Sequence, residues 1–346
     1  MLLLSLPENV VWFAVAVYLG YASAVFLAAV SSAVNSNPDG RAEAIVLGTS
    51  LMLSEKLKSE INKIWPKQGP SESQVIKYLK KYKKEKIIIK CGGSVLLDPN
   101  LFNLFIQDIV VMKKLGLTPI IVHGGGPRIK KKLNELNIKS TFIKGLRVTD
   151  KKIIKIVEDV LIKFNKEIVK ALRDQSCGAR SITTREYNII LVKPEKKELG
   201  FVGIPNEIKT NILNEIIDAN EIPVLAPIGL DENNQPHNIN ADIAAGALAK
   251  KLKSRRLLLM TDVKGVYDKD KKLISEITAI QAIQMMNEDI IVGGMIPKIN
   301  TCIDAINNGV RGVVIIDGRR PHSILYELFS DQGSGTLIRK WKSLKQ

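Results

Sequence analysis

Short apolar runs of strand length alternate with longer amphipathic segments from residue 87 onward, and this alternation constrains the fold more than any other feature. The runs lie at 87–89, 119–122, 189–192, 222–226, 256–261 and 313–316. Runs without an internal polar alternation are typical of strands buried on both faces of a parallel sheet. Helical segments between the strands predict an α/β fold with an open, mainly parallel sheet.

Residues 1–70 differ from the rest of the chain. Residues 10–34 carry no charged side chain. This uncharged segment is long enough for a tilted transmembrane helix. A cleavable signal peptide fits less well, because Glu8 replaces the usual basic residues ahead of the apolar stretch. A buried hairpin helix or an untranslated or unordered upstream extension are the other interpretations. Residues 35–70 are rich in proline and glycine turns and predict a linker.

The basic residues after the apolar stretch predict the orientation of such a helix. They are Arg41, Lys56, Lys58 and Lys63, and they place the C-terminal part in the cytoplasm. Membrane contact through residues 10–34 stays an open expectation at this point. Residues 71–346 are predicted to form the main domain, also in the cytoplasm, where ATP is available.

The formal net charge of +16 permits a nucleic-acid, membrane or anionic ligand. Lysines are scattered over nearly every predicted helix without interleaved aromatic residues, so we expect solvated surfaces and no nucleic-acid partner. Cys91, Cys177 and Cys302 are too far apart for a zinc site or a disulfide framework. The three histidines are equally isolated, so no metal site built by the protein is predicted.

Glycine turns follow two of the predicted strands. Gly92 and Gly93 follow the first strand, and 124–126 follow the second, with Pro127 opening a helix. Backbone amides at such positions can bind phosphate, although a single glycine turn is often only a tight turn. Neither turn matches a Walker loop, a dinucleotide fingerprint or a protein-kinase loop. The pattern therefore calls for a different phosphate-handling fold.

Several short motifs occur together in one order. They are Lys90-Cys91-Gly92-Gly93, the His-Gly-Gly-Gly-Pro run at 123–127, the segment 145–149 (GLRVT), 238–242 (NINAD), 261–267 (TDVKGVY) and 293–298 (GGMIPK). Together they resemble the N-acetylglutamate kinase branch of the amino acid kinase family, over about residues 71–339. The resemblance implies a three-layer αβα sandwich, with an acceptor lobe at about 71–235 and a nucleotide lobe at about 236–346.

The resemblance also implies a reaction. ATP would phosphorylate the γ-carboxylate of N-acetyl-L-glutamate to N-acetylglutamyl 5-phosphate, a step of arginine biosynthesis. A carboxylate acceptor is already ionised at neutral pH, so no general base is needed and catalysis reduces to alignment and charge neutralisation. Lys90 and Lys298 match the lysines that stabilise the transferred phosphoryl group, and Asp242 matches the carboxylate that holds both.

Binding roles follow from the same motifs. Arg147 would grip the acceptor's α-carboxylate, Gly125 and Gly126 would supply backbone donors, and Asn238 would bind the acylated amino acid. The nucleotide is expected at Gly92, Gly93, Thr261, Asp262, Gly265, Gly293 and Gly294. Magnesium would be held mainly by the ATP phosphates, because no acidic cluster supplies a cage.

Regulation is predicted from the segments that flank the core. The helix at 73–84 and the tail at 327–336 resemble those of arginine-inhibited family members, so feedback inhibition by arginine and a dimer or hexamer are expected. Gln332 stands where those members often have an acidic residue. Cys91 also departs from the larger apolar or aromatic residue that the family commonly has, without removing a backbone donor.

Other functions remain open. Within the family they are glutamate, aspartate, carbamate, UMP and carrier-linked aminoadipate kinases. Outside it, a silent nucleotide-binding regulator would be expected to lack one of Lys90, Asp242 or Lys298, and all three are present. A membrane-tethered interaction module would depend only on residues 10–34.

Overall fold

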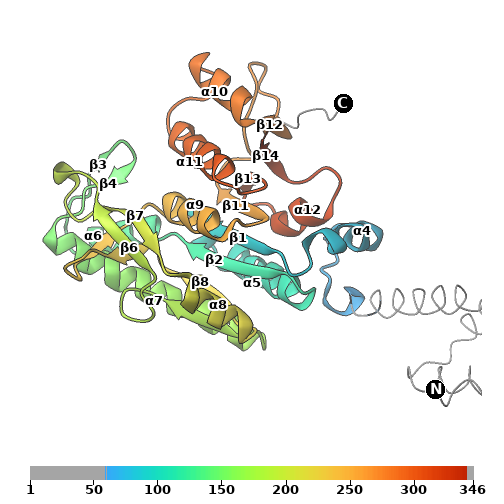
Figure 1. Ribbon diagram of the computed structural model, residues 1–346, viewed down its shortest axis with the longest axis horizontal. Helices are drawn as coiled ribbons and strands as arrows, with labels where there is room; N and C mark the ends of the chain where they lie inside the picture. The colour runs from blue at the N-terminus through green and yellow to red at the C-terminus, as the bar shows by residue number, and fades with distance from the viewer. Residues whose placement is uncertain (1–58, 60, 341–346) are drawn as a thin grey trace, which may run out of the picture. The chain divides into compact units, whose positions relative to one another are not determined.

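The structure, a computed structural model, describes residues 59 and 61–340 (Figure 1). The chain divides into two compact units, residues 1–65 and 66–346. The predicted membrane segment at 10–34 lies outside the described residues. Within the described ones, no helix combines the length and the apolar character that a membrane crossing needs.

An eight-stranded sheet runs through the second unit in the order β12-β14-β13-β11-β1-β2-β8-β5. Neighbouring strands are parallel except β13 and β14, which are antiparallel. The predicted open and mainly parallel sheet is confirmed. Its strands are β1 (Lys86–Cys91), β2 (Thr118–His123), β5 (Ala179–Ile182), β8 (Ile222–Leu225), β11 (Arg256–Thr261), β12 (Glu276–Thr278), β13 (Val313–Asp317) and β14 (Gly335–Arg339).

Helices cover both faces of this sheet, as side chains on β1 illustrate. Ile88 joins a core cluster with residues of α8, α9 and α11, while Ile87 and Ile89 point to the opposite face and are equally buried. On that opposite face α5 packs on β2 and α12 on β13. The predicted three-layer sandwich is confirmed. The helices named here are α5 (Pro99–Lys114), α8 (Thr210–Asp218), α9 (Ala241–Leu252), α11 (Met295–Asn307) and α12 (Ser323–Phe329).

A second sheet of four strands has the order β10-β9-β6-β7. The apolar run at 189–192 forms β6 of this sheet, so its assignment to the large parallel sheet was wrong. The strand returns to its neighbour β7 through the short segment 195–202 and pairs with it antiparallel, whereas parallel neighbours need a long crossover. The strands are β6 (Ile190–Pro194), β7 (Gly203–Ile208), β9 (Ile228–Leu230) and β10 (Pro236–Asn238).

Residues of a small hairpin and of two helices line a cavity at the carboxyl ends of β1 and β2. A hairpin formed by β3 (Phe142–Ile143) and β4 (Leu146–Arg147) lies near α6 (Gly126–Glu135) and α7 (Lys151–Asp174) (Figure 1). The predicted division into lobes near residue 235 stays a prediction, although β10 pairs with β9 across it. The other helices are α4 (Glu72–Tyr82) and α10 (Ala279–Asn287).

Candidate active site

Asp242 lies between two lysines. Lys298 Nζ donates a hydrogen bond to Asp242 Oδ2 at 2.5 Å, and Lys90 Nζ lies 3.0 Å from Oδ1 as an ion pair. All three side chains are largely buried, with 12–16% of their surface exposed. The structure therefore brings together the three residues for which the sequence predicts catalytic roles; the roles themselves stay a prediction.

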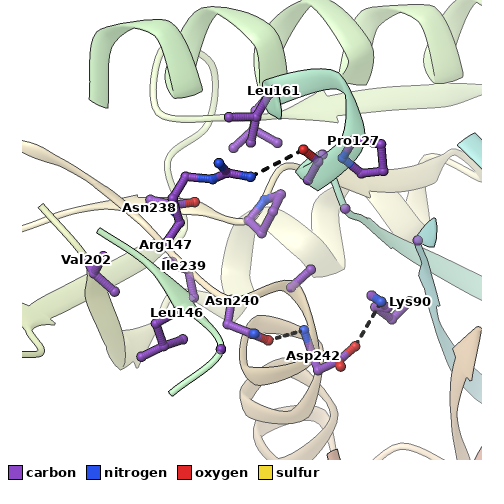
Figure 2. A pocket seen from close by; sticks show the side chains of 18 of the residues that line it. Lys90, Pro127, Leu146, Arg147, Leu161, Val202, Asn238, Ile239, Asn240 and Asp242 are labelled. Carbon is purple, nitrogen blue, oxygen red and sulfur yellow. Dashed lines mark hydrogen bonds and ion pairs between the residues drawn. The ribbon is translucent and has the colours of Figure 1, made fainter. Parts of the chain in front are cut away.

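Local structure explains how the three meet. Lys90 lies near the end of β1, and Lys298 lies in the first turn of α11, which packs on α9. Asp242 lies in the first turn of α9, which Asn240 caps by accepting hydrogen bonds from the amides of Asp242 and Ile243 at 2.9 and 3.2 Å (Figure 2). Asn240 therefore fixes the start of the helix that carries the carboxylate.

The charge state of Asp242 follows from its partners. Burial by itself raises the pKa of this carboxyl, but the ammonium charges of Lys90 and Lys298 outweigh it and lower the pKa to about 2. Asp242 is therefore ionised at neutral pH. Its single negative charge leaves the three-residue cluster with a net positive charge, which favours an anionic ligand.

A cavity of about 270 Å³ adjoins Lys90 and Asp242. Its lining combines backbone of two glycine turns, a few polar side chains and an apolar wall, as is usual for a small-molecule site. The lining residues are Lys90, Gly92, Gly93, Gly124, Gly125, Gly126, Pro127, Ile129, Phe142, Gly145, Leu146, Arg147, Leu161, Val202, Pro227, Asn238, Ile239, Asn240, Ala241 and Asp242. All four residues predicted to bind the acceptor are among them.

Arg147 is the most buried cation of this cavity, with 7% of its surface exposed. Its guanidinium donates to Ser140 Oγ and lies 4.7 Å from the ring centre of Phe142. It also donates, at 3.3 Å, to the carbonyl of Gly126, the bond drawn from Arg147 in Figure 2. Among the described residues no carboxylate pairs with it. Burial lowers the pKa of Arg147, so an anion in the cavity would relieve a desolvated charge.

The second glycine turn faces the same space. A Cβ on Gly126 would meet nothing within 4 Å, whereas one on Gly125 would lie 2.5 Å from Leu161 Cδ2. Neither amide donates a hydrogen bond to another described residue, and Gly126 begins α6. Free amides at a helix start can bind an anion. Asn238 ends β10 at the same wall of the cavity.

His123 contacts the backbone of this turn through the carbonyl of Gly124. It is fully buried, and its Nδ1 lies 2.8 Å from the carbonyl of Gly124 while Nε2 lies 3.2 Å from Asn165 Nδ2. Donation from Nδ1 and acceptance at Nε2 require the neutral ring. Burial lowers the pKa of His123 to about 4, so the ring is neutral at physiological pH.

The residues predicted to bind nucleotide fall in three places. Gly92 and Gly93 line the first cavity, and a Cβ on Gly93 would lie 2.5 Å from Asp262 Oδ1. Gly265 lines a second cavity of about 550 Å³, bounded also by residues 266–269, 271, 288–292 and 295. Thr261 ends β11, and Gly293 and Gly294 precede α11 without lining either cavity.

Several residues near these cavities were not predicted. Ser140, which orients Arg147, lies on an exposed loop, and Leu161 comes from α7. Asp317 and Arg319 form a bidentate pair at the end of β13. An Asp-Gly-Arg turn directly after an apolar run could have pointed to this pair, whereas no spacing in the sequence indicates Ser140 or Leu161.

The site can hold an anionic acceptor beside a cluster of two ammonium groups. The described part of the chain contains no group of three or more acidic, histidine or cysteine side chains that could cage a metal ion.

Comparison with known proteins identifies the family. The sequence model of the amino acid kinase family matches residues 85–317. The acetylglutamate kinase of Pelagibacter ubique is 59% identical over 83% of this chain and 100% of its own length. The acetylglutamate kinase of Rhodospirillum rubrum is 43% identical over 82% of this chain and 96% of its own length.

Solved structures share the fold. N-acetylglutamate synthase from Neisseria gonorrhoeae, complexed with coenzyme A and N-acetyl-glutamate, superposes with a TM-score of 0.71 at 21% identity; the match covers 78% of this chain and 63% of the synthase chain. Carbamate kinase from Giardia lamblia bound to AMP-PNP gives 0.57 at 17% identity, over 74% of this chain and 99% of that one. The chain belongs to the amino acid kinase family, within which its sequence groups with the acetylglutamate kinases.

Proposed function

We propose that the chain transfers the γ-phosphoryl group of ATP to the side-chain carboxylate of N-acetyl-L-glutamate, producing N-acetylglutamyl 5-phosphate in arginine biosynthesis. The Lys90–Asp242–Lys298 cluster beside a cavity that contains Arg147 carries this proposal. A buried guanidinium without a carboxylate partner among the described residues suits the α-carboxylate of an amino acid. The acetylglutamate kinases at 59% and 43% identity support the acceptor.

The reaction needs few groups. An acceptor carboxylate oxygen attacks the γ-phosphorus in line, the new O–P bond forms, and the bond to the leaving ADP oxygen breaks. No proton moves, because the acceptor is an anion at neutral pH. Lys90 and Lys298 would stabilise the charge on the transferring oxygens, and Asp242 holds the two ammonium groups near each other against their repulsion.

The second cavity is proposed to take the adenine. Tyr267, Ile290, Val292 and Met295 line it with apolar surface. Gly265 also lines it, and a Cβ at this position would collide with Thr336. The phosphates would then extend past Asp262 toward Gly93. Magnesium, when bound with ATP, supplies charge neutralisation; its ligands would be mainly phosphate oxygens and water.

Product formation decides between this function and its alternatives. Coupled ADP release should be measured with N-acetylglutamate, glutamate, aspartate, carbamate and UMP supplied separately. Turnover with N-acetylglutamate should exceed the others by at least about 100-fold in kcat/KM, since the free amine of glutamate would replace the acyl group near Asn238. Faster turnover with any other acceptor contradicts the proposal, and ADP binding without turnover would favour a regulator.

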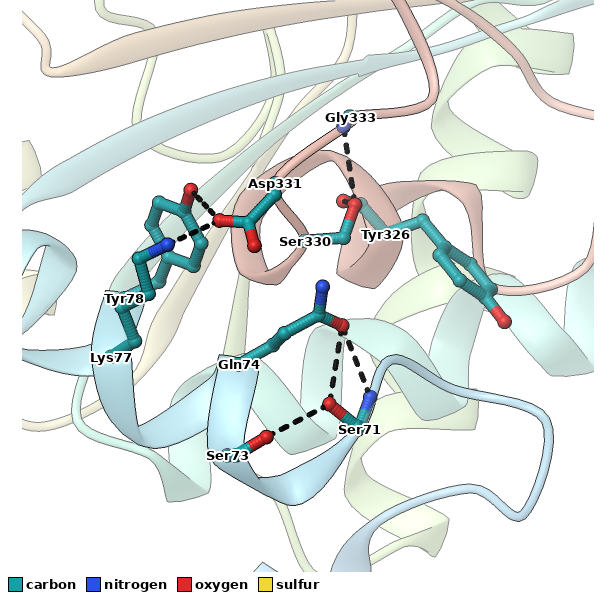
Figure 3. A network of polar contacts seen from close by, with 9 residues as sticks. All are labelled: Ser71, Ser73, Gln74, Lys77, Tyr78, Tyr326, Ser330, Asp331 and Gly333. Carbon is teal, nitrogen blue, oxygen red and sulfur yellow. Dashed lines mark hydrogen bonds and ion pairs between the residues drawn. The ribbon is translucent and has the colours of Figure 1, made fainter.

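We also propose inhibition by arginine where α4 meets α12. Lys77 Nζ and the Tyr78 hydroxyl both contact Asp331 Oδ1, at 2.5 and 2.7 Å, and link the two segments (Figure 3). Glu327 lies on α12 and accepts a hydrogen bond from the Ser334 amide; burial raises its pKa. The guanidinium group of an arginine ligand would neutralise the charge of the Glu327 carboxylate. The arginine complex of the related synthase fold, at 20% identity, supports the ligand.

The chain is also proposed to form a homo-oligomer and to be located in the cytoplasm. The helix that precedes β1 in arginine-inhibited members predicts a homo-oligomer, a dimer or a hexamer, which sedimentation of the full chain would test. The reaction uses ATP, and Cys91, Cys177 and Cys302 are free and buried. Both fit a reducing cytoplasm.

The arginine proposal has its own test. Glu327→Gln should raise the arginine concentration for half inhibition by about tenfold, because a charged partner is lost, while kcat without arginine stays the same. Arginine without effect on the unmodified chain contradicts the regulation and leaves the catalytic proposal standing.

A further inference from the structure

Two neighbouring arginines follow β13 and lie in different surroundings. Arg319 donates to Asp317 twice, from Nε to Oδ1 at 2.9 Å and from Nη2 to Oδ2 at 2.8 Å. Arg320 instead places its guanidinium carbon 4.5 Å from the ring centre of Tyr326 on α12. The second arginine is therefore a matched comparison for the first.

The Asp317–Arg319 pair lies at the ligand-binding edge of the sheet. Asp317 is in register with Thr261 of β11, and the Gly318 amide donates to the Thr261 carbonyl at 2.9 Å. A Cβ on Gly318 would collide with Val95, in the turn that follows β1. The pair is thus attached to both segments that border the proposed phosphate position, at the carboxyl ends of parallel strands.

The guanidinium of Arg319 can still bind a ligand. Half of its side chain is exposed, whereas that of Asp317 is 10% exposed. The pairing occupies Nε and one N–H of Nη2, and among the described residues the guanidinium makes no further hydrogen bond. Nη1 and the second N–H of Nη2 are available. Because Asp317 already fixes the plane of the guanidinium, little side-chain freedom would be lost on binding.

Nearby charges connect Arg319 with both parts of the nucleotide site. Asp317 is the main cause that raises the pKa of Arg319, and Asp262 and Tyr267 act in the same direction. Asp262 borders Gly93, and Tyr267 lines the second cavity. Arg319 is thus within electrostatic range of the proposed phosphate turn and of the proposed adenine cavity.

We propose that Arg319 binds the α- and β-phosphate oxygens of ATP and ADP, with Asp317 as the residue that positions it. Arg319 would hold the part of the nucleotide that does not react, while Lys90 and Lys298 act on the transferred group. A planar fork with two free donors suits a diphosphate, which offers neighbouring oxygens. The inference rests on the proposed function, because it takes the nucleotide as the ligand.

The test is binding of ADP and of adenosine to the full chain, measured by calorimetry for Arg319→Gln, Arg319→Lys and Arg320→Gln. Arg319→Gln should weaken ADP binding about 10- to 100-fold, the range expected for a hydrogen bond to a charged group, and leave adenosine binding unchanged. Arg319→Lys should fall between, since it keeps the charge without the fork. Arg320→Gln should bind ADP like the unmodified chain.

Two results would overturn the inference. One is Arg319→Gln with unchanged ADP affinity, and the other is an equal loss of affinity in Arg320→Gln. If the unmodified chain binds no ADP, the nucleotide site itself is contradicted, and the inference with it. Thermal unfolding of each variant shows whether the half-exposed position was replaced without disturbing the fold.

Discussion

Lys90 folds back over Gly92, so that a Cβ on Gly92 would lie 2.5 Å from Lys90 Nζ and 3.0 Å from Cε. The absence of a side chain at Gly92 therefore leaves room for the ammonium group of Lys90. Sequence motifs with two glycines are often explained only by phosphate contact. Here the first glycine makes room for a side chain of the same strand.

Replacing Gly92 with alanine should displace the Lys90 ammonium and lower kcat about 10- to 100-fold. The end of a lysine side chain is flexible, so the chain should still fold and its thermal midpoint should stay within a few degrees. Steady-state kinetics at saturating ATP and acceptor measure the change. A variant with unchanged kcat would show that the position of Lys90 over Gly92 is not needed.

Removing the lysines themselves should be more severe. Lys90→Ala or Lys298→Ala should lower kcat by about 10³-fold or more, because a charge that we propose stabilises the transferred phosphoryl group is lost, while ATP still binds. Lys86→Ala, on the same strand, is the control: Lys86 Nζ lies 3.5 Å from Asn214 Oδ1, away from the cluster. Near-normal turnover of either site variant would exclude the assigned role.

Arg147→Lys should weaken binding of the acceptor. We expect KM for N-acetylglutamate to rise about 10- to 100-fold with KM for ATP unchanged, because lysine cannot form two parallel hydrogen bonds with a carboxylate. Arg185→Lys is a suitable control, since Arg185 pairs with Glu158 and Asp159 at the surface. An equal rise of both KM values would point to a general disturbance of the site.

Much of the site could be predicted, and its limits have physical causes. Lys90, Asp242 and Lys298 lie in short motifs whose positions are dictated by backbone: a strand end and two helix starts. The backbone pattern of parallel strands then brings them to one edge. Ser140 lies on a loop, and only the tertiary structure puts its hydroxyl against Arg147.

The fold was predictable to the same degree. Buried strands of the large sheet were recognised because both of their faces are apolar, as Ile87 and Ile88 show. The run at 189–192 is equally apolar, yet it lies in the small sheet and pairs antiparallel with β7. The apolar composition of a strand indicates that it is buried, but not which strand it pairs with. The short connection from β6 to β7 was the feature that indicates antiparallel pairing.

The fully buried His123 predicts a pH dependence of stability. Its folded pKa of about 4 lies below the unfolded value of about 6.5, so the folded chain resists protonation. The contribution is present above pH 6.5 and is lost as the pH falls toward 4, by about 3 kcal/mol in total. Acid should therefore favour unfolding through this group.

A second buried group acts in the opposite direction. Asp108 lies 2.6 Å from His322, and burial raises its pKa to about 6 despite that partner. Its contribution is present below the unfolded pKa of about 3.9 and is lost as the pH rises through 6. The two effects oppose each other between pH 4 and 6, so the unmodified chain alone cannot separate them.

His123→Asn makes the separation possible. Urea unfolding of both chains between pH 4 and 7 should give free energies whose difference changes by about 3 kcal/mol across that range, because the Asp108 effect is common to both and cancels. The cost of the substitution itself shifts the difference equally at every pH. A difference that stays constant would mean that His123 is protonated as easily in the folded chain as in the unfolded one. The assignment of a neutral His123 ring that orients the Gly124 turn would then be wrong.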